Sequence, residues 1–152
     1  MPSFYVIFAG FLNGDTAAKA TTGEPGFSTV AKASSPVGSC PVTPTAGTLT
    51  AANYTFKFKA GSLAVTPAPL YVTAYNQKIA HGAPLPKFTY AFAGFVNGDT
   101  AAVATGAPVL STTATSASPA GTYPITVAAG TLTAANYMLK LKPGTLTITP
   151  GS

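Results

Sequence analysis

The sequence predicts an all-β protein made of two tandem Ig-like modules, each an antiparallel β-sandwich. Apolar and polar side chains alternate along several short segments, which is the pattern of strands that bury one face. Long phrases of the sequence also occur twice, so the same fold is expected twice. Hydrophobic residues make up 47% of the chain and charged residues only 7%. This composition favours a folded chain, because disordered chains are poor in apolar residues.

An eight-residue phrase, GTLTAANY, marks the internal repeat: it occupies positions 47–54 and returns at 130–137. Two further phrases return with few changes: AGFLNGDTAA at 9–18 matches AGFVNGDTAA at 93–102, and SPVGSCPVT at 35–43 matches SPAGTYPIT at 118–126. The second copy also begins with PAPLYVTAYNQKIAHGAP, for which the first copy has no counterpart. The repeat is therefore one complete copy preceded by a shorter one.

This repeat predicts the domain organisation. We expect residues 1–67 to form a first module that lacks its opening strand, and residues 68–152 to form a complete second module. The joint between them, TPAP at 66–69, holds two prolines. Because proline restricts φ and favours extended backbone, this joint is expected to be short and fairly stiff.

Five segments show the two-residue alternation of a strand: residues 54–59, 70–75, 88–93, 137–142 and 145–149. In the first of them, Tyr54, Phe56 and Phe58 face one way and polar residues face the other. The phrases KAG at 59–61 and KPG at 142–144 predict hairpin turns between adjacent strands. A complete module then has about six or seven strands in about 80 residues, which fits an antiparallel sandwich.

Only two related phrases, GDTAAKA and GDTAAVA, suggest helix. Asp15 and Asp99 precede these phrases' alanines and are predicted to cap one short helical turn each. A β-grasp-like arrangement around this turn is the alternative fold. The Asn-Gly pairs at 13–14 and 97–98 predict tight turns.

Residues 94–150 closely resemble the MBG family, the mostly-β, glycine-rich repeats of bacterial surface proteins and large adhesins. The specific part of the resemblance lies in GFVNGDT, GTYPIT and AANY. The repeat signature consists of Gly94, Phe95, Asn97, Gly98, Asp99, Gly121, Tyr123, Asn136 and Tyr137. The family usually has Tyr-Gly shortly after its first strand, where this chain has His81-Gly82. The resemblance implies secreted, tandem, non-catalytic modules that are extracellular or at the cell surface.

The residues that carry chemistry are few, and we expect no catalysis, no cofactor and no metal. His81 is the only histidine and stands in a predicted turn, and Asp15 and Asp99 occupy equivalent positions of different copies. Cys40 is the only cysteine, which excludes an intrachain disulfide, and we expect it to be a small buried apolar residue. Calcium needs about six to eight oxygen ligands, and each NGD phrase offers one carboxylate.

The charge pattern argues against nucleic acid and membrane as partners. The net charge of +5 comes from eight lysines and three acids, with no arginine and no basic cluster that carries stacking aromatics. Lysines on strands are explained by protection of sheet edges. An apolar run of about 18 residues is absent from the sequence, so no membrane insertion is expected.

We predict a non-catalytic structural or spacer module of a bacterial cell-surface or secreted adhesin-like protein, with neighbouring repeats as its partners. The alternative is an adhesion module that binds a glycan or a host or cell-surface protein through exposed loops or through Tyr71 and Tyr75. The missing strand adds one expectation, an open edge beside Phe4, Val6 and Phe8. This edge is expected either to receive a strand from a partner copy or to reflect an excerpt of a longer array.

Overall fold

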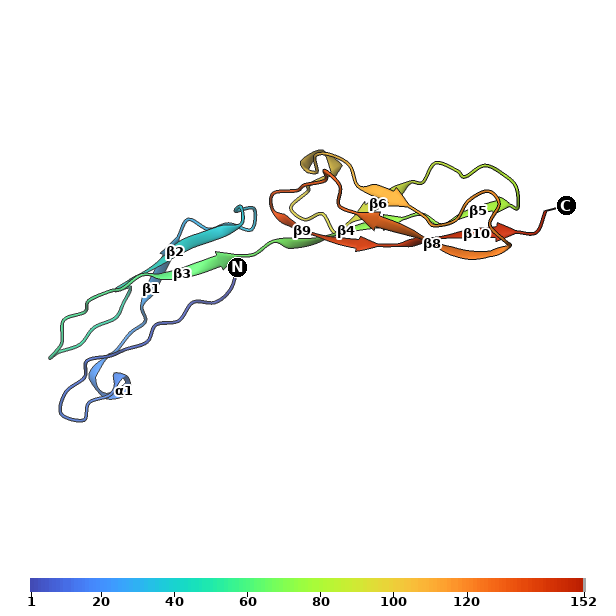
Figure 1. Ribbon diagram of the computed structural model, residues 1–152. Coiled ribbons are helices and arrows are strands. Elements are labelled where there is room, and N and C mark those ends of the chain that lie inside the picture. The colour runs from blue at the N-terminus through green and yellow to red at the C-terminus, as the bar shows by residue number, and fades with distance from the viewer. Residues whose placement is uncertain (152) are drawn as a thin grey trace. The chain divides into compact units, whose positions relative to one another are not determined.

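The computed structural model describes residues 1–151, and the chain forms two compact units with their boundary between Thr66 and Pro67. Strands dominate both units, so the predicted all-β class is confirmed (Figure 1). The strands of the first unit are β1 (Gly26–Thr29), β2 (Gly38–Thr45) and β3 (Gly61–Val65). Those of the second unit are β4 (Ala68–Ala74), β5 (Gln77–Ala80), β6 (Tyr90–Ala93), β7 (Val109–Ser111), β8 (Gly121–Ala128), β9 (Tyr137–Lys142) and β10 (Gly144–Thr149).

The second unit has two sheets, with strand orders β6-β4-β9 and β5-β10-β8-β7. In the first of these sheets, β4 lies in the middle, antiparallel to β6 and parallel to β9. In the other sheet, β10 is parallel to β5 and antiparallel to β8. The pairing is therefore mixed, whereas the sequence predicts antiparallel sheets. Alternation reports which face of a strand is buried and says nothing about the direction of the neighbouring strand.

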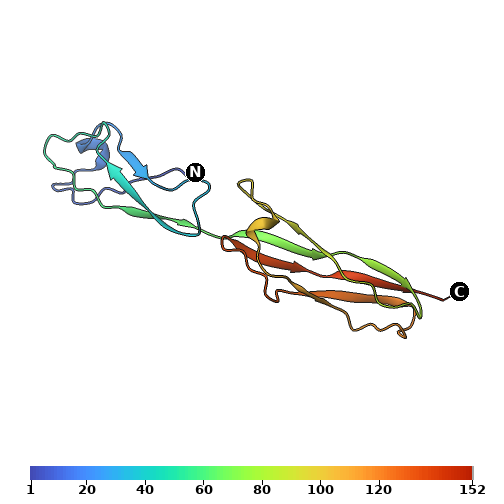
Figure 2. The ribbon, with the colours of Figure 1, turned by 90° about the horizontal axis from the view of Figure 1, so that it is seen from above.

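The chain passes from β9 into β10 without reversing, and only Pro143 separates the two strands (Figures 1 and 2). The hairpin predicted at 142–144 is therefore wrong, because β9 pairs with β4 and β10 pairs with β5. At the crossing, a Cβ on Gly144 would lie 2.7 Å from the Ala74 carbonyl oxygen. The glycine lets the chain change sheets directly beside the end of β4.

The core of the second unit is formed by side chains from both of its sheets. Leu70 and Val72 of β4, Ile125 of β8 and Leu146 of β10 are all 0% exposed. Alternate residues of β4 and β10 are buried, as the two-residue period predicts. Complete burial of one such side chain contributes about 1.5–3 kcal/mol, so β4 is a principal source of this unit's stability.

The first unit has one antiparallel sheet, β1-β2-β3, whose strands correspond through the internal repeat to β7, β8 and β10. Its described residues include no counterpart of β4. The strand predicted at 54–59 does not form, because its counterpart β9 is an edge strand that pairs with β4 alone. For the same reason residues 6–9, the counterpart of β6, have no strand partner. The hairpin predicted at 59–61 is consequently absent.

Both predicted helical turns are present, as α1 (Ala17–Ala20) and as a 3-10 turn, η1 (Ala101–Val103). Their N-caps are threonines rather than the predicted aspartates. Thr16 caps α1 without a side-chain hydrogen bond, and the Thr100 hydroxyl accepts a hydrogen bond from the Ala102 backbone N–H at 3.3 Å. Asp15 and Asp99 are one residue too early, and their carboxylates serve another interaction that is described below.

We expect Gly144→Ala to destabilise the second unit by about 1–3 kcal/mol, because the new Cβ overpacks against the backbone of β4. That Cβ would lie 2.7 Å from the Ala74 carbonyl oxygen and 2.9 Å from that of Tyr75. Denaturant unfolding together with hydrogen exchange of the β4 and β9 amides measures the loss. Gly61→Ala is the matched control, because nothing lies within 4 Å of a Cβ at that equivalent position. Equal destabilisation by both variants would contradict the prediction.

Candidate functional site

The repeat signature of the second unit converges on one tight turn. Asn97 and Gly98 both have positive φ, 57° and 78°, as the two central residues of a type I′ turn do. The backbone N–H of Asp99 closes this turn on the Val96 carbonyl at 3.0 Å. The first unit repeats the geometry, with φ of 56° and 77° at its Asn-Gly pair. The turns predicted from these dipeptides are confirmed.

A tyrosine at the start of β9 fastens this turn. Tyr137 is 8% exposed, and its hydroxyl donates to the Asp99 carboxylate at 2.6 Å and accepts from the Val96 N–H at 3.1 Å. Tyr54 makes the same contacts in the first unit: it donates to Asp15 at 2.7 Å and accepts from the Leu12 N–H at 3.0 Å. We call each tyrosine with its aspartate a Tyr–Asp latch. The aspartates that the sequence assigns to helix caps are therefore acceptors for a distant tyrosine.

The latches raise the pKa of both tyrosines above the ordinary value of 10.0. For Tyr137, burial is the largest cause and the hydrogen bond to Asp99 adds to it, while the Val96 N–H acts in the opposite direction. For Tyr54, the Leu12 N–H is the largest influence and lowers the pKa, but Asp15 and burial together outweigh it. Both hydroxyls therefore keep their protons beyond pH 10.

Aromatic and backbone contacts surround the second latch. The Phe95 ring lies between Phe92, with centroids 5.7 Å apart, and Tyr137, at 5.8 Å and nearly perpendicular. Asn136 precedes β9, and its carbonyl accepts a hydrogen bond from the Ala68 N–H at 3.1 Å, where β4 begins. The latch, the aromatic group and the start of β4 thus form one cluster at one end of the unit.

Three other signature residues serve the backbone. Gly94 has φ of 107°, and a Cβ there would lie 2.6 Å from the Pro69 carbonyl oxygen, so the chain passes close against β4. Tyr123 is half-buried in β8 and donates its hydroxyl to the Pro119 carbonyl at 2.9 Å. Gly121 begins β8 and is exposed. The signature is therefore an arrangement of turns and close backbone contacts.

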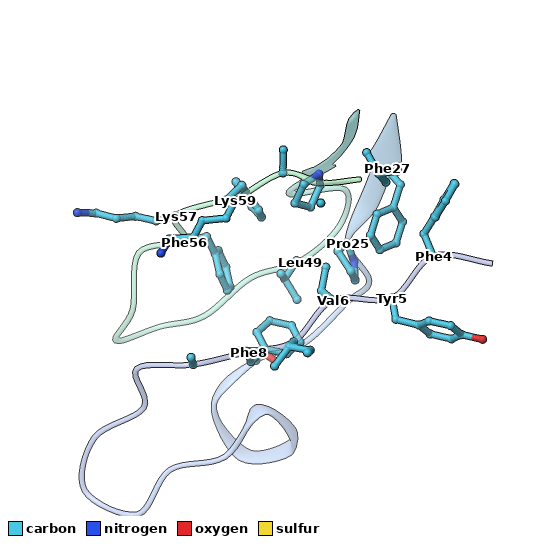
Figure 3. Close-up of a pocket in the computed structure, with 18 of the residues that line it drawn as sticks. Phe4, Tyr5, Val6, Phe8, Pro25, Phe27, Leu49, Phe56, Lys57 and Lys59 are labelled. Atoms are coloured by element: carbon cyan, nitrogen blue, oxygen red, sulfur yellow. The ribbon is translucent and has the colours of Figure 1, made fainter. Parts of the chain in front are cut away.

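The first unit contains a groove of about 870 Å³ where the second unit holds β4 (Figure 3). Its two walls are residues 3–11 and 54–62, and its floor includes Phe27, Val42 and Leu49. We call this cavity the strand groove. It lies beside the residues where the sequence predicts an open edge. The sequence does not predict the opposite wall or the floor, because no local pattern indicates which two strands would lie on either side of a first strand.

The side chains of the first wall alternate about the strand groove. Phe4, Val6 and Phe8 are half-buried and line it (Figure 3). Tyr5 and Ile7 also border it, but they are 86% and 96% exposed. The periodicity of a strand is thus present in residues that have no strand partner. Apolar side chains are held along the groove in the order in which a strand displays them.

The two tyrosines considered as ligand contacts differ in their surroundings. Tyr71 is half-buried in β4, and the Lys142 Nζ lies 4.6 Å from its ring centroid, so a cation already occupies one face of this ring. Tyr75 follows β4 and is 55% exposed. Contact of either ring with a glycan or protein ligand stays a prediction.

The remaining chemically active residues are scattered. His81 is exposed in a turn, with Nδ1 3.0 Å from the Ser118 carbonyl oxygen. Cys40 is half-buried in β2, so the expectation of a buried thiol is only partly right. Within residues 1–151, no three His, Cys, Asp or Glu side chains gather as metal ligands. None of the helical turns in that part of the chain has the length and hydropathy of a bilayer span.

Two stretches of the chain, residues 1–64 and 70–147, match the family described as MBG domain (YGX type). This chain belongs to the MBG domain family. Curated proteins and solved structures give no match. The two units are therefore two MBG repeats, and the sequence resemblance is confirmed. In the second repeat, Gly82 keeps a positive φ of 85° and its N–H donates to the Ser116 carbonyl at 2.9 Å.

We expect the second MBG repeat to lose stability as pH rises above 10.0, because the folded state holds the Tyr137 proton more tightly than the unfolded state does. A raised pKa contributes stability that is complete below the ordinary value and disappears as pH passes the folded pKa. Melting temperatures measured between pH 8 and about pH 11.5 test this.

Tyr137→Phe is the matched variant for this prediction. It should melt at a lower temperature at pH 8, since the Val96 N–H and the Asp99 carboxylate lose their partner. It should also lose part of the alkaline destabilisation. Tyr75→Phe, at an exposed ring, serves as the control. An unchanged alkaline slope in Tyr137→Phe would show that the latch does not hold the proton.

Proposed function

We propose that this chain is a non-catalytic spacer of a bacterial cell-surface or secreted adhesin-like protein, in which MBG repeats pass mechanical tension from one to the next. The observation that carries the proposal is the parallel pairing of the first two strands of the complete repeat with its last two, β4 with β9 and β5 with β10. Membership of the MBG family supports the repeat character of the protein. The surface location rests on the likeness of the sequence to repeats of surface proteins.

Parallel terminal strands bring the chain in at one end of the repeat and out at the other. Ala68, at the start of β4, pairs with Tyr137 at the start of β9. Ala80, at the end of β5, pairs with Thr149 at the end of β10. The consecutive strands β4 and β5 run beside the consecutive strands β9 and β10 through the length of the repeat (Figure 2). The chain therefore enters the repeat at one end and leaves it at the opposite end, as a spacer requires.

This arrangement also resists stretching. A force applied to both ends pulls β4 and β9 past each other along their own axes, and it does the same to β5 and β10. Because the inter-strand hydrogen bonds of a ladder lie across the strands, they share such a force and must break together. A fold whose terminal strands left from the same end would instead open one bond at a time.

The polar residues of the signature support a structural role. Asp99 accepts from Tyr137, and Asn97 supplies the left-handed turn that presents this aspartate. Tyr123 donates to a backbone carbonyl. These groups maintain turns and strand ends, which is the requirement of a module whose task is to keep its shape.

Single-molecule pulling tests the tension-bearing role in a Cys40→Ser background. Handles on Pro67→Cys and Pro150→Cys load the terminal strands lengthwise. Handles on His81→Cys and Pro150→Cys are the matched control, because the His81 N–H lies 2.8 Å from the Thr149 carbonyl and these positions share one end of the repeat. We expect a several-fold higher unfolding force in the first geometry. Equal forces would remove the basis of the spacer proposal.

Surface exposure is tested on intact cells that produce the protein. An antibody raised against this chain should label them before lysis, and brief external protease treatment should remove the label. Labelling that requires lysis would contradict a surface location. On a glycan array the chain should give no signal. A signal that is lost in Tyr75→Ala would instead identify a binding module.

A further inference from the structure

The strand groove of the first repeat matches the position of β4 in the second. In the second repeat, Val72 of β4 pairs with Phe92 on one side and with Leu141 on the other. Through the internal repeat, Phe8 stands for Phe92 and Phe58 stands for Leu141. Both phenylalanines line the groove, one on each wall. The two walls are therefore the two neighbours of a strand, held apart without it.

The walls offer free backbone as well as apolar side chains. No described residue forms a backbone–backbone hydrogen bond with residues 4–9 or 55–59. An extended segment placed between them would pair on both edges, as β4 does with β6 and β9. Its inward side chains would meet Val42 and Leu49 on the floor.

Two glycines of the first repeat, Gly10 and Gly61, point to the same occupant when they are compared with their counterparts in the second repeat. A Cβ on Gly94 would lie 2.6 Å from the Pro69 carbonyl oxygen, and one on Gly144 would lie 2.7 Å from that of Ala74. The second repeat needs these glycines because the backbone of β4 passes over them. Their counterparts are Gly10 and Gly61, and a Cβ on either would meet nothing within 4 Å. Both glycines border the groove and leave room for a strand backbone.

A lysine completes the match. Lys142 lies over the ring of Tyr71, an outward residue of β4, and its counterpart in the first repeat is Lys59. Lys59 is exposed on the wall of the strand groove. An incoming strand with an aromatic residue at the position of Tyr71 would meet the same cation.

We propose that the strand groove of the first MBG repeat binds an extended peptide segment with the chemistry of β4, that is, an MBG first strand not already docked in its own repeat. The occupant carries apolar side chains at alternate positions and an aromatic side chain facing outward between them. It pairs antiparallel to residues 6–9 and parallel to residues 54–59. β4 of a second copy of this chain is a less favourable source of the occupant, because its Leu70 and Val72 are already fully buried in their own repeat. The inference goes beyond the spacer role, since it concerns strand capture by the first repeat alone.

The test is titration of the full chain with a fluorescent peptide of residues 67–76, PAPLYVTAYN, followed by anisotropy. Saturable binding is expected, together with new hydrogen-exchange protection in residues 4–9 and 54–59. A peptide with aspartate in place of Leu70 and Val72 is the control ligand, and it should not bind. Absence of saturable binding, or protection confined to the second repeat, would overturn the proposal.

Gly61→Ala is the decisive protein variant, because it adds a Cβ where the docked strand needs its carbonyl. It should keep the stability of the parent chain and lose peptide affinity by about ten-fold or more. Tyr5→Ser, at an exposed residue on the outer side of the same wall, should bind normally. Equal affinity of Gly61→Ala and parent, or a dimer that protects the groove without peptide, would refute this occupant.

Discussion

The pairing of β4 on both of its edges is the constraint on which the structure depends. β4 joins β6 to β9 and brings Leu70, Val72 and Ala74 into the core of the second repeat. Where β4 is present, its neighbours are strands. The described residues of the first repeat include no such segment, and there closely similar sequences form no strand and their phenylalanines line a groove. An edge strand has no stability of its own in water, because its hydrogen bonds and its apolar contacts both come from its partner.

The Tyr–Asp latch explains why the strand groove keeps its form without a strand in it. Tyr54 begins one wall, and Asp15 closes the turn that ends the other. Their hydrogen bond joins residues 39 positions apart and fixes the spacing of the walls at one end. The second repeat uses the same latch across 38 positions, beside the start of β4. The latch and the strand therefore have separate roles: the latch fixes the spacing of the two walls, and the strand occupies the space between them.

The same arrangement links the proposed roles of the two repeats. In the complete repeat, β4 lies parallel to β9 and β5 lies parallel to β10, and the proposed spacer role rests on these pairs. In the first repeat, this position is open and its walls are apolar. The strand on which the proposed spacer role of the second repeat depends thus has the chemistry of the strand that we propose the first repeat captures.

The sequence by itself determined the β class, the duplication, the buried face of each strand and the two Asn-Gly turns, because these follow from local conformational preference and from a two-residue period. It also pointed to the open edge beside Phe4, Val6 and Phe8, since a missing segment is visible in an alignment of the two copies. Only the tertiary structure decided that β4 runs parallel to β9, that Pro143 continues the chain rather than reversing it, and that Asp99 accepts a hydrogen bond from Tyr137. Strand direction, sheet crossing and long-range hydrogen bonds depend on which partner lies beside a segment, and that information is shared between residues far apart in the chain.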